Sequence, residues 1–213
     1  MHIKLEHVLP GEIEKRSFEL IAAELGDRVF PPDQEAVVKR VIHTSADFDY
    51  ADHLRFSPGA VQAGIDALRI GAIIVTDTNM AKAGINKEAA AKLGCAVECF
   101  MGDPEIAQSA QKNGTTRAVA CINRAATLGG NVIFAVGNAP TALIRLCELI
   151  TEGTLRPKLV IGVPVGFVNV VESKELIMDT DVPYIVAQGR KGGSNIAAAI
   201  CNALLYQATG RLL

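Results

Sequence analysis

Short apolar runs recur along the chain after residue 70, and each is followed by a polar turn and a stretch of helical periodicity. The runs are rich in β-branched residues and do not alternate with polar ones, as is typical of strands buried on both faces. The predicted strands are 72–75, 96–99, 132–136, 159–163 and 184–187. The predicted helices between and after them are 86–93, a pair within 104–128, 139–152, 172–178 and 194–209. This order predicts a doubly wound parallel sheet with helices on both faces.

Three further helices are predicted before the sheet, at 11–25, 33–44 and about 58–69, and Ser57 is the candidate N-cap of the last one. In the first, Ile13, Leu20 and Ile21 share one face by the 3.6-residue period, and Ser17 points with them. The Ser17 hydroxyl is then either a donor in a pocket or bonded back to a helix carbonyl. Asp33 is a candidate cap for the second helix.

The densest polar stretch of the chain reads Arg40-Val-Ile-His43-Thr44-Ser45-Ala-Asp47-Phe-Asp49-Tyr50. Arg40 and His43 are three residues apart and therefore share a helix face. His43 falls in the last turn, where the helix dipole favours imidazolium, so it is a candidate proton donor. The alternative is an ordinary surface histidine, which is the commoner role for this residue on a helix.

In doubly wound sheets, ligands bind outside the carboxyl ends of the strands. Polar residues, glycines and prolines gather at those ends here, in 76–80, 100–103, 137–141, 164–167 and 188–194. Segment 137–141 places Pro140 in the first turn of a helix, whose free N–H groups would suit an anion. Segment 188–194 adds Arg190 and Lys191 to a run of glycines. Taken singly, these glycines could equally be ordinary turns and helix caps.

Composition narrows the function classes. The 213 residues fit a single domain spanning 1–213, with an aliphatic core that contains no Trp. The net charge is −2 and the basic residues are dispersed, so no nucleic-acid surface is predicted. The five cysteines form no Cys-x-x-Cys pair, which argues against a disulfide framework and a zinc site. A polar N-terminus and the lack of a membrane-length apolar run predict a cytoplasmic protein without membrane contact.

Several chemistries lack their signature. There is no Gly-x-Ser-x-Gly elbow, no phosphate-binding Gly-x-x-x-x-Gly-Lys-Ser/Thr, no dinucleotide Gly-x-Gly-x-x-Gly and no cluster with metal-ligand spacing. One imidazole, several hydroxyls and a cationic cleft remain. Such a site suits proton transfer on a polycarboxylate.

Five motifs, in this order along nearly the whole chain, closely resemble precorrin-8X methylmutases and their cobalt-precorrin-8 counterparts. They are the stretch from Arg40 to Tyr50, Thr76-Asp-Thr-Asn-Met80, Gly137-Asn-Ala-Pro-Thr141, Gly162-Val-Pro-Val-Gly-Phe167 with Glu172-Ser-Lys174, and Gly189-Arg-Lys-Gly-Gly-Ser194. One departure is Asn169-Val-Val171, where that family usually has Gly or Ala.

The resemblance implies a flavodoxin-like three-layer α/β/α fold and a homodimer. It implies an isomerase of cobalamin (vitamin B12) biosynthesis that moves a methyl group from ring carbon eleven to ring carbon twelve of a corrinoid tetrapyrrole, (cobalt-)precorrin-8, giving cobyrinate or hydrogenobyrinate. No cofactor is implied, because any cobalt would belong to the substrate.

The family's catalytic histidine falls on His43, as proton donor and acceptor, and its substrate contacts fall on Ser17, Arg40 and Arg117. The polar motifs add further expected substrate contacts. These are Thr44, Asp77, Asn138, Arg190 and Lys191.

Two other functions stay open at this point. The cleft could serve a non-catalytic tetrapyrrole carrier, or the fold could serve a phosphate-binding regulator. A phosphoacceptor site would need clustered acids beside Asp77, for which Asp103 is the only candidate neighbour among the strand-end segments. Both the metal-free and the cobalt-bearing substrate fit the motifs, since the macrocycle itself would hold the metal.

Overall fold

The computed structural model describes residues 6–211, and within them six strands form one sheet in the order β1-β6-β5-β4-β2-β3. The strands are β1 (Leu54–Phe56), β2 (Ile73–Thr76), β3 (Ala96–Glu98), β4 (Val132–Val136), β5 (Leu159–Gly162) and β6 (Tyr184–Ala187). Strands β2 to β6 are parallel, as predicted, and the strand order reverses between β2 and β4. The short edge strand β1, antiparallel to β6, was not predicted.

Helices make up most of the remaining chain. They are α1 (Ile13–Leu25) after a 3-10 turn (Pro10–Glu12), α2 (Pro32–Ser45), α3 (Tyr50–His53), α4 (Ala60–Arg69), α5 (Asn79–Gly84), α6 (Lys87–Lys92), α7 (Pro104–Lys112), α8 (Arg117–Ala125) with a 3-10 turn (Ala126–Leu128), α9 (Pro140–Thr151), α10 (Val170–Met178) and α11 (Ser194–Ala208). None of the helices in residues 6–211 is long and apolar enough to cross a bilayer. The first five residues, on which the prediction of a cytoplasmic protein partly rests, lie outside the described part.

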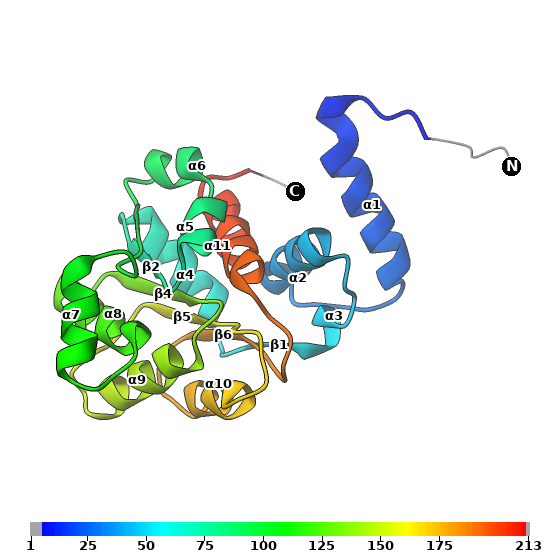
Figure 1. Cartoon of the computed structure of the whole chain (residues 1–213). Helices are drawn as coiled ribbons and strands as arrows, with labels where there is room; N and C mark the ends of the chain where they lie inside the picture. Colours follow the sequence, from blue (N-terminus) through cyan, green and yellow to red (C-terminus); the bar gives the residue numbers. More distant parts are fainter. Residues whose placement is uncertain (1–5, 212–213) are drawn as a thin grey trace, which may run out of the picture.

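Each parallel strand sends alternate side chains to opposite faces, which creates two cores. Ile133 and Ala135 of β4 join one hydrophobic cluster, whereas Val132, Phe134 and Val136 join the other. Helices α2, α4 and α11 cover the first face, and α8, α9 and α10 cover the second (Figure 1). The three-layer α/β/α arrangement is therefore confirmed.

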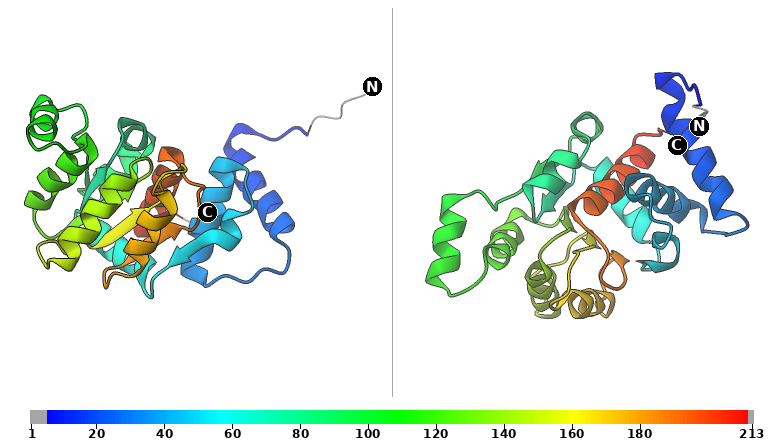
Figure 2. Two further views of the ribbon diagram at one scale, coloured as in Figure 1. Left: turned by 60° about the horizontal axis from the view of Figure 1, so that its bottom comes forward. Right: turned by 45° about the vertical axis from the view of Figure 1, so that its right-hand side comes forward.

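Helix α1 lies on the outer side of α2, at the opposite end of the molecule from α7 (Figures 1 and 2). Its inner face buries Phe18, Ile21 and Leu25, while Ile13 and Leu20 remain 54% and 50% exposed. The predicted buried face was thus wrong by part of a turn, because Phe18 and not Ile13 faces α2. The Ser17 hydroxyl donates to the Ile13 carbonyl at 2.8 Å, which is the back-bonded arrangement.

Three local features decide helix starts in ways that the sequence pattern did not show. Asp33 makes no capping bond, since α2 begins at Pro32, which needs no N–H partner. Ser57 does not cap α4, which begins at Ala60; its hydroxyl instead accepts the Tyr184 N–H at 2.9 Å and so extends the β1–β6 edge. Asn169, where the sequence departs from the family pattern, directly precedes α10. Its φ of +56° is a left-handed conformation, which Asn tolerates better than most residues.

Gly137, directly after β4, marks a close approach between the sheet and α11. A Cβ at this position would lie 2.7 Å from the Ser194 Cα and 2.8 Å from the Gly193 carbonyl oxygen. Both atoms belong to backbone and cannot rotate away. The contact holds the start of α11 against the carboxyl end of the sheet.

We expect Gly137→Ala to lower the free energy of unfolding by about 1–3 kcal/mol, because the added methyl must displace the start of α11. Gly130→Ala is the matched control, since no atom lies within 4 Å of its added Cβ. Urea denaturation of both variants measures the difference. Equal stability of the two would contradict the close approach.

Candidate active site

Asp77 occupies the point where the strand order reverses, between the carboxyl ends of β2 and β4. Its two carboxylate oxygens accept the backbone N–H groups of Gly137, Asn138 and Ala139 at 2.7–2.9 Å. The side chain is only 4% exposed. Burial raises the pKa of Asp77, although the three amide hydrogen bonds act in the opposite direction.

Asp77 changes what the loop after β4 can offer a ligand. Pro140 does stand at the first position of α9, as predicted. The amides of the three residues before it already bind the Asp77 carboxylate, so these amides are not free for an anion, contrary to expectation. Asp77 therefore shapes the loop that presents the exposed side chain of Asn138.

Further hydroxyl pairs join the segments around this loop. The Thr78 and Ser194 hydroxyls lie 2.7 Å apart and link the start of α5 to the start of α11. The Thr116 and Thr141 hydroxyls lie 3.1 Å apart and link α8 to α9. Because Arg117 directly follows Thr116, its exposed side chain begins beside the same loop. We call Asp77, Thr78, Arg117, Asn138 and Ser194 the switch-point group.

His43 lies in the last turn of α2, as predicted, with its ring exposed. It stacks on Phe18 of α1, with ring centroids 5.1 Å apart and an interplanar angle of 14°. Within residues 6–211 no hydrogen bond occupies either ring nitrogen of His43, so both can meet an incoming molecule.

The protonation state of His43 differs from the sequence-based expectation. Burial lowers the pKa of His43, the neighbouring Arg40 charge lowers it further, and Glu14 acts in the opposite direction. The helix dipole is therefore outweighed, and the neutral imidazole is favoured at neutral pH. The resting His43 is a proton acceptor, and its protonated form is a stronger acid than an ordinary histidine.

Arg40 is 6% exposed and lies between two aromatic rings. Its guanidinium carbon is 4.7 Å from the Phe18 ring centroid and 5.0 Å from that of Tyr206. It donates to Glu14, which also accepts from Arg211. Burial would raise the pKa of Glu14, but the hydrogen bond and charge of Arg40, together with those of Arg211, bring it below the ordinary value.

Two nitrogens of Arg40, Nε and Nη2, are buried without a hydrogen-bond partner in the described part of the chain. A cavity of about 220 Å³ lies beside Arg40, between α2 and α11. Thr44, Asn195 and Asn202 contribute polar side chains to its wall. The Thr44 hydroxyl already donates to the Arg40 carbonyl, and the Asn202 amide to the Gly84 carbonyl. Asn195 is the polar wall residue whose side chain has no hydrogen bond within residues 6–211.

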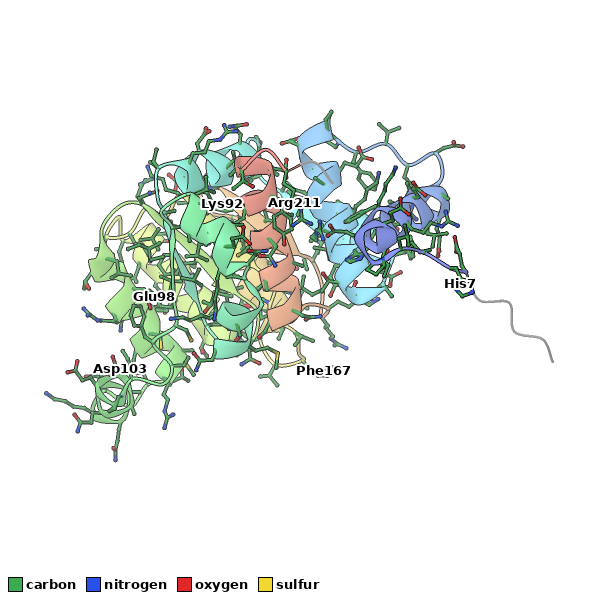
Figure 3. All side chains as sticks on the ribbon, turned by 90° about the horizontal axis from the view of Figure 1, so that it is seen from above. His7, Lys92, Glu98, Asp103, Phe167 and Arg211 are labelled. Atoms are coloured by element: carbon green, nitrogen blue, oxygen red, sulfur yellow. The ribbon has the colours of Figure 1, made fainter. Side chains whose placement is uncertain are left out.

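The two cations of the β6–α11 loop are already engaged. Lys191 Nζ lies 2.6 Å from a carboxylate oxygen of Asp47 and 2.6 Å from one of Asp49. These hydrogen bonds raise the pKa of Lys191. Arg190 lies over the ring of Phe167, 5.5 Å from its centroid, and both side chains are exposed. Figure 3 shows Phe167 toward one end of α11 and Arg211 toward the other.

The predicted site residues therefore form two groups. Ser17, Arg40, His43 and Thr44 lie on α1 and α2, and Arg117 and Asn138 lie at the switch point. Within residues 6–211 no hydrogen bond or ion pair joins the groups directly, and Lys191 ties the segment after α2 to the carboxyl edge. A cavity of about 500 Å³ lies at the opposite edge of the sheet, beside Ile70, Pro157 and Val182. It shares no residue with either group.

The residues that surround His43 and Arg40 were missed in the sequence. Glu14 and Phe18 are one turn apart on α1, a spacing that could have suggested a shared contact. Tyr206 and Arg211 come from the end of the chain, so no local signal could have linked them to α2.

A family model described as precorrin-8X methylmutase matches residues 12–207. The chain belongs to this family.

Individual relatives agree with the family model. A cobalt-precorrin-8 methylmutase from Salmonella typhimurium is 47% identical over 203 residues, covering 92% of this chain and 95% of the relative. A cobalt-precorrin-8 methylmutase from Priestia megaterium is 45% identical over 197 residues, covering 92% of this chain and 88% of the relative. The solved structure of precorrin-8x methyl mutase from Thermus thermophilus matches with a TM-score of 0.85 and 42% identity, covering 93% of this chain and 98% of that one. The resemblance inferred from the five motifs is confirmed. The roles of individual site residues stay predictions.

We expect Asp77→Asn to lower the free energy of unfolding by about 1–3 kcal/mol, because the new amide NH₂ would oppose one of the three buried N–H donors. Asp103→Asn is the matched control. Asp103 accepts only the Glu105 N–H at 2.9 Å as the cap of α7, and Asn caps helices equally well. Urea denaturation of both variants tests this. A loss no larger than that of the control would show that the charge of Asp77 is not needed by the loop.

Proposed function

We propose that this protein catalyses the methyl shift of the precorrin-8X methylmutases, converting precorrin-8 or cobalt-precorrin-8 into the corresponding corrin acid. Membership of the family carries this proposal. The exposed His43 ring, with both nitrogens unoccupied and the buried Arg40 three residues away, is the structural observation that supports it most directly.

The reaction needs little covalent chemistry from the protein. A methyl group migrates between neighbouring ring carbons, and no nucleophile or redox cofactor takes part. The protonated form of His43 would donate a proton that polarises the conjugated ring system, and the neutral imidazole would then take one back, so that no net proton is consumed. A rigid surface that holds the macrocycle in one orientation supplies the rest.

The peripheral acetate and propionate groups of the corrinoid would meet the local donors of this chain. The cavity beside Arg40 and Thr44 could take one carboxylate arm. Arg117 and Arg190 are exposed cations, and Arg offers a two-pronged match to carboxylate. Asn138 adds an exposed amide at the switch point. Lys191 would act through Asp47 and Asp49, because its charge is already shared with them.

The remaining parts of the proposal are the metal, the assembly and the compartment. The two relatives compared above are named for the cobalt-bearing substrate, which favours that form. Ile13 and Leu20 form an exposed apolar stripe on α1, which favours a homodimer that covers it. All five cysteines are free, in keeping with a reducing cytoplasm.

The direct test is turnover of precorrin-8 with and without cobalt, under anaerobic conditions, followed by the visible spectrum. Catalytic conversion at a protein concentration far below that of the substrate would support the mutase. Stoichiometric binding with no conversion of either form would favour the carrier function and overturn the proposal.

We expect His43→Gln to reduce turnover by about 10²–10⁴-fold while product binding stays near that of the wild type, because only proton transfer is lost. His53→Gln is the control, since that exposed histidine bonds the Asp49 carbonyl and does not contact Phe18 or Arg40. Spectroscopic assays of turnover and of product titration separate the two effects. A His43 variant with near wild-type turnover would remove this residue from the mechanism.

The lowered pKa of His43 predicts the pH dependence of kcat/KM, which reports the free enzyme. If the imidazolium donates the proton, kcat/KM should fall as pH rises through a value below about 6.5, the ordinary pKa of histidine. Glu14→Gln should move this decline to lower pH, because the Glu14 charge raises the His43 pKa. A decline centred above pH 7, or no change in Glu14→Gln, would contradict this assignment.

A further inference from the structure

Lys174 is a fully buried lysine in the middle of α10, with 0% exposure. Its ammonium donates to the backbone carbonyls of Gly189 and Lys191, at 2.7 and 2.8 Å. No carboxylate within residues 6–211 forms an ion pair with it. Burial without a counter-charge lowers the pKa of Lys174 to about 8.

Residues 189–191 form the segment that Lys174 holds, and each of their three backbone carbonyls accepts a hydrogen bond from α10 or the loop before it. The Arg190 carbonyl between the two bonded ones accepts the Gly166 N–H at 3.2 Å. Gly189 has φ +84°, a conformation that favours glycine. Because all three carbonyls point toward the β5–α10 side, the side chains of Arg190 and Lys191 are presented outward.

Lys191 connects this turn to the end of α2 through two ion pairs. Its ammonium lies 2.6 Å from carboxylate oxygens of both Asp47 and Asp49, which follow α2 directly. The Asp47 N–H bonds the Ser45 hydroxyl, and Ser45 is the last residue of that helix. The last turn of α2 carries His43. Helix α10, which carries Lys174, and α2, which carries His43, lie on opposite faces of the sheet (Figure 1). The contacts of Lys174 and Lys191 connect them.

A buried ammonium is a costly way to fill this volume, since an apolar side chain would avoid the loss of hydration. Met, of similar length, could pack on α10 but could not donate to the two carbonyls. The feature that requires a lysine here is the conformation of residues 189–191.

We propose that Lys174 is a positioning residue for the methyl shift, which holds the 189–191 turn so that Lys191, through Asp47 and Asp49, fixes the α2 turn that carries His43. The expected loss of kcat rests on the proposed function, whereas the expected displacement of His43 rests on the geometry alone.

The test compares Lys174→Met, Lys191→Met and the double variant, with Lys92→Met as control. Lys92 also forms an ion pair, with Glu88 one turn earlier on α6, and neither residue belongs to this network. Lys174→Met and Lys191→Met should each lower kcat by about 10–100-fold, with KM within about threefold of wild type, because His43 is misplaced and not removed. The double variant should lose no more than Lys191→Met alone, since both lysines act in series.

A second measurement needs no turnover. The ring-proton NMR signal of His43, assigned by its loss in His43→Gln, should shift or broaden in both variants and stay unchanged in Lys92→Met. Lys191 is exposed, so its variant should fold even if Lys174→Met does not. An unmoved His43 signal in folded Lys191→Met, or additive losses in the double variant, would overturn the inference. A moved signal in a protein whose wild type shows no turnover would support the positioning role and overturn the proposed function.

Discussion

The carboxylate of Asp77 is the contact on which the catalytic face depends. It joins the carboxyl ends of β2 and β4 across the point where the strand order reverses, by accepting three consecutive N–H groups. Without it, those amides would be left without partners under the start of α11, where Gly137 leaves no room for rearrangement. The loop after β4 is therefore fixed from both sides, by Asp77 and by the start of α11.

Charge is arranged locally, in a protein with a net charge of only −2. Arg40 is shared with Glu14, and Lys191 with Asp47 and Asp49, so neither offers a free positive charge to a polyanionic substrate. Arg117 and Arg190 remain exposed. Paired cations position loops and helices, whereas the exposed ones are available for binding. Under the proposed function, this division would let a slightly acidic chain serve a substrate with many carboxylates.

The protonation state of His43 depends on its tertiary contacts as well as on its position in α2. Its place at the end of α2 favours the charged form, but the adjacent Arg40 and partial burial against Phe18 favour the neutral one. Phe18 comes from α1, and Tyr206, which contacts Arg40, comes from α11, so residues of three helices surround the pair formed by Arg40 and His43. The stack also leaves both nitrogens of His43 open, which a hydrogen-bonded histidine would not.

The sequence by itself determined the sheet, most helices and the family. Non-alternating β-branched runs can be satisfied only by strands covered on both faces, and the polar residues at their ends must meet at one edge. The tertiary structure alone decided which polar groups are free. Asp77 consumes the amides before Pro140, Ser17 bonds its own helix, and Lys174 reaches the turn before α11. The Asp77 and Lys174 contacts join residues 15 to 62 positions apart, and residue spacing within one helix or strand carries no record of them. The Ser17 bond is local, and the structure selected it from the two arrangements that the sequence left open.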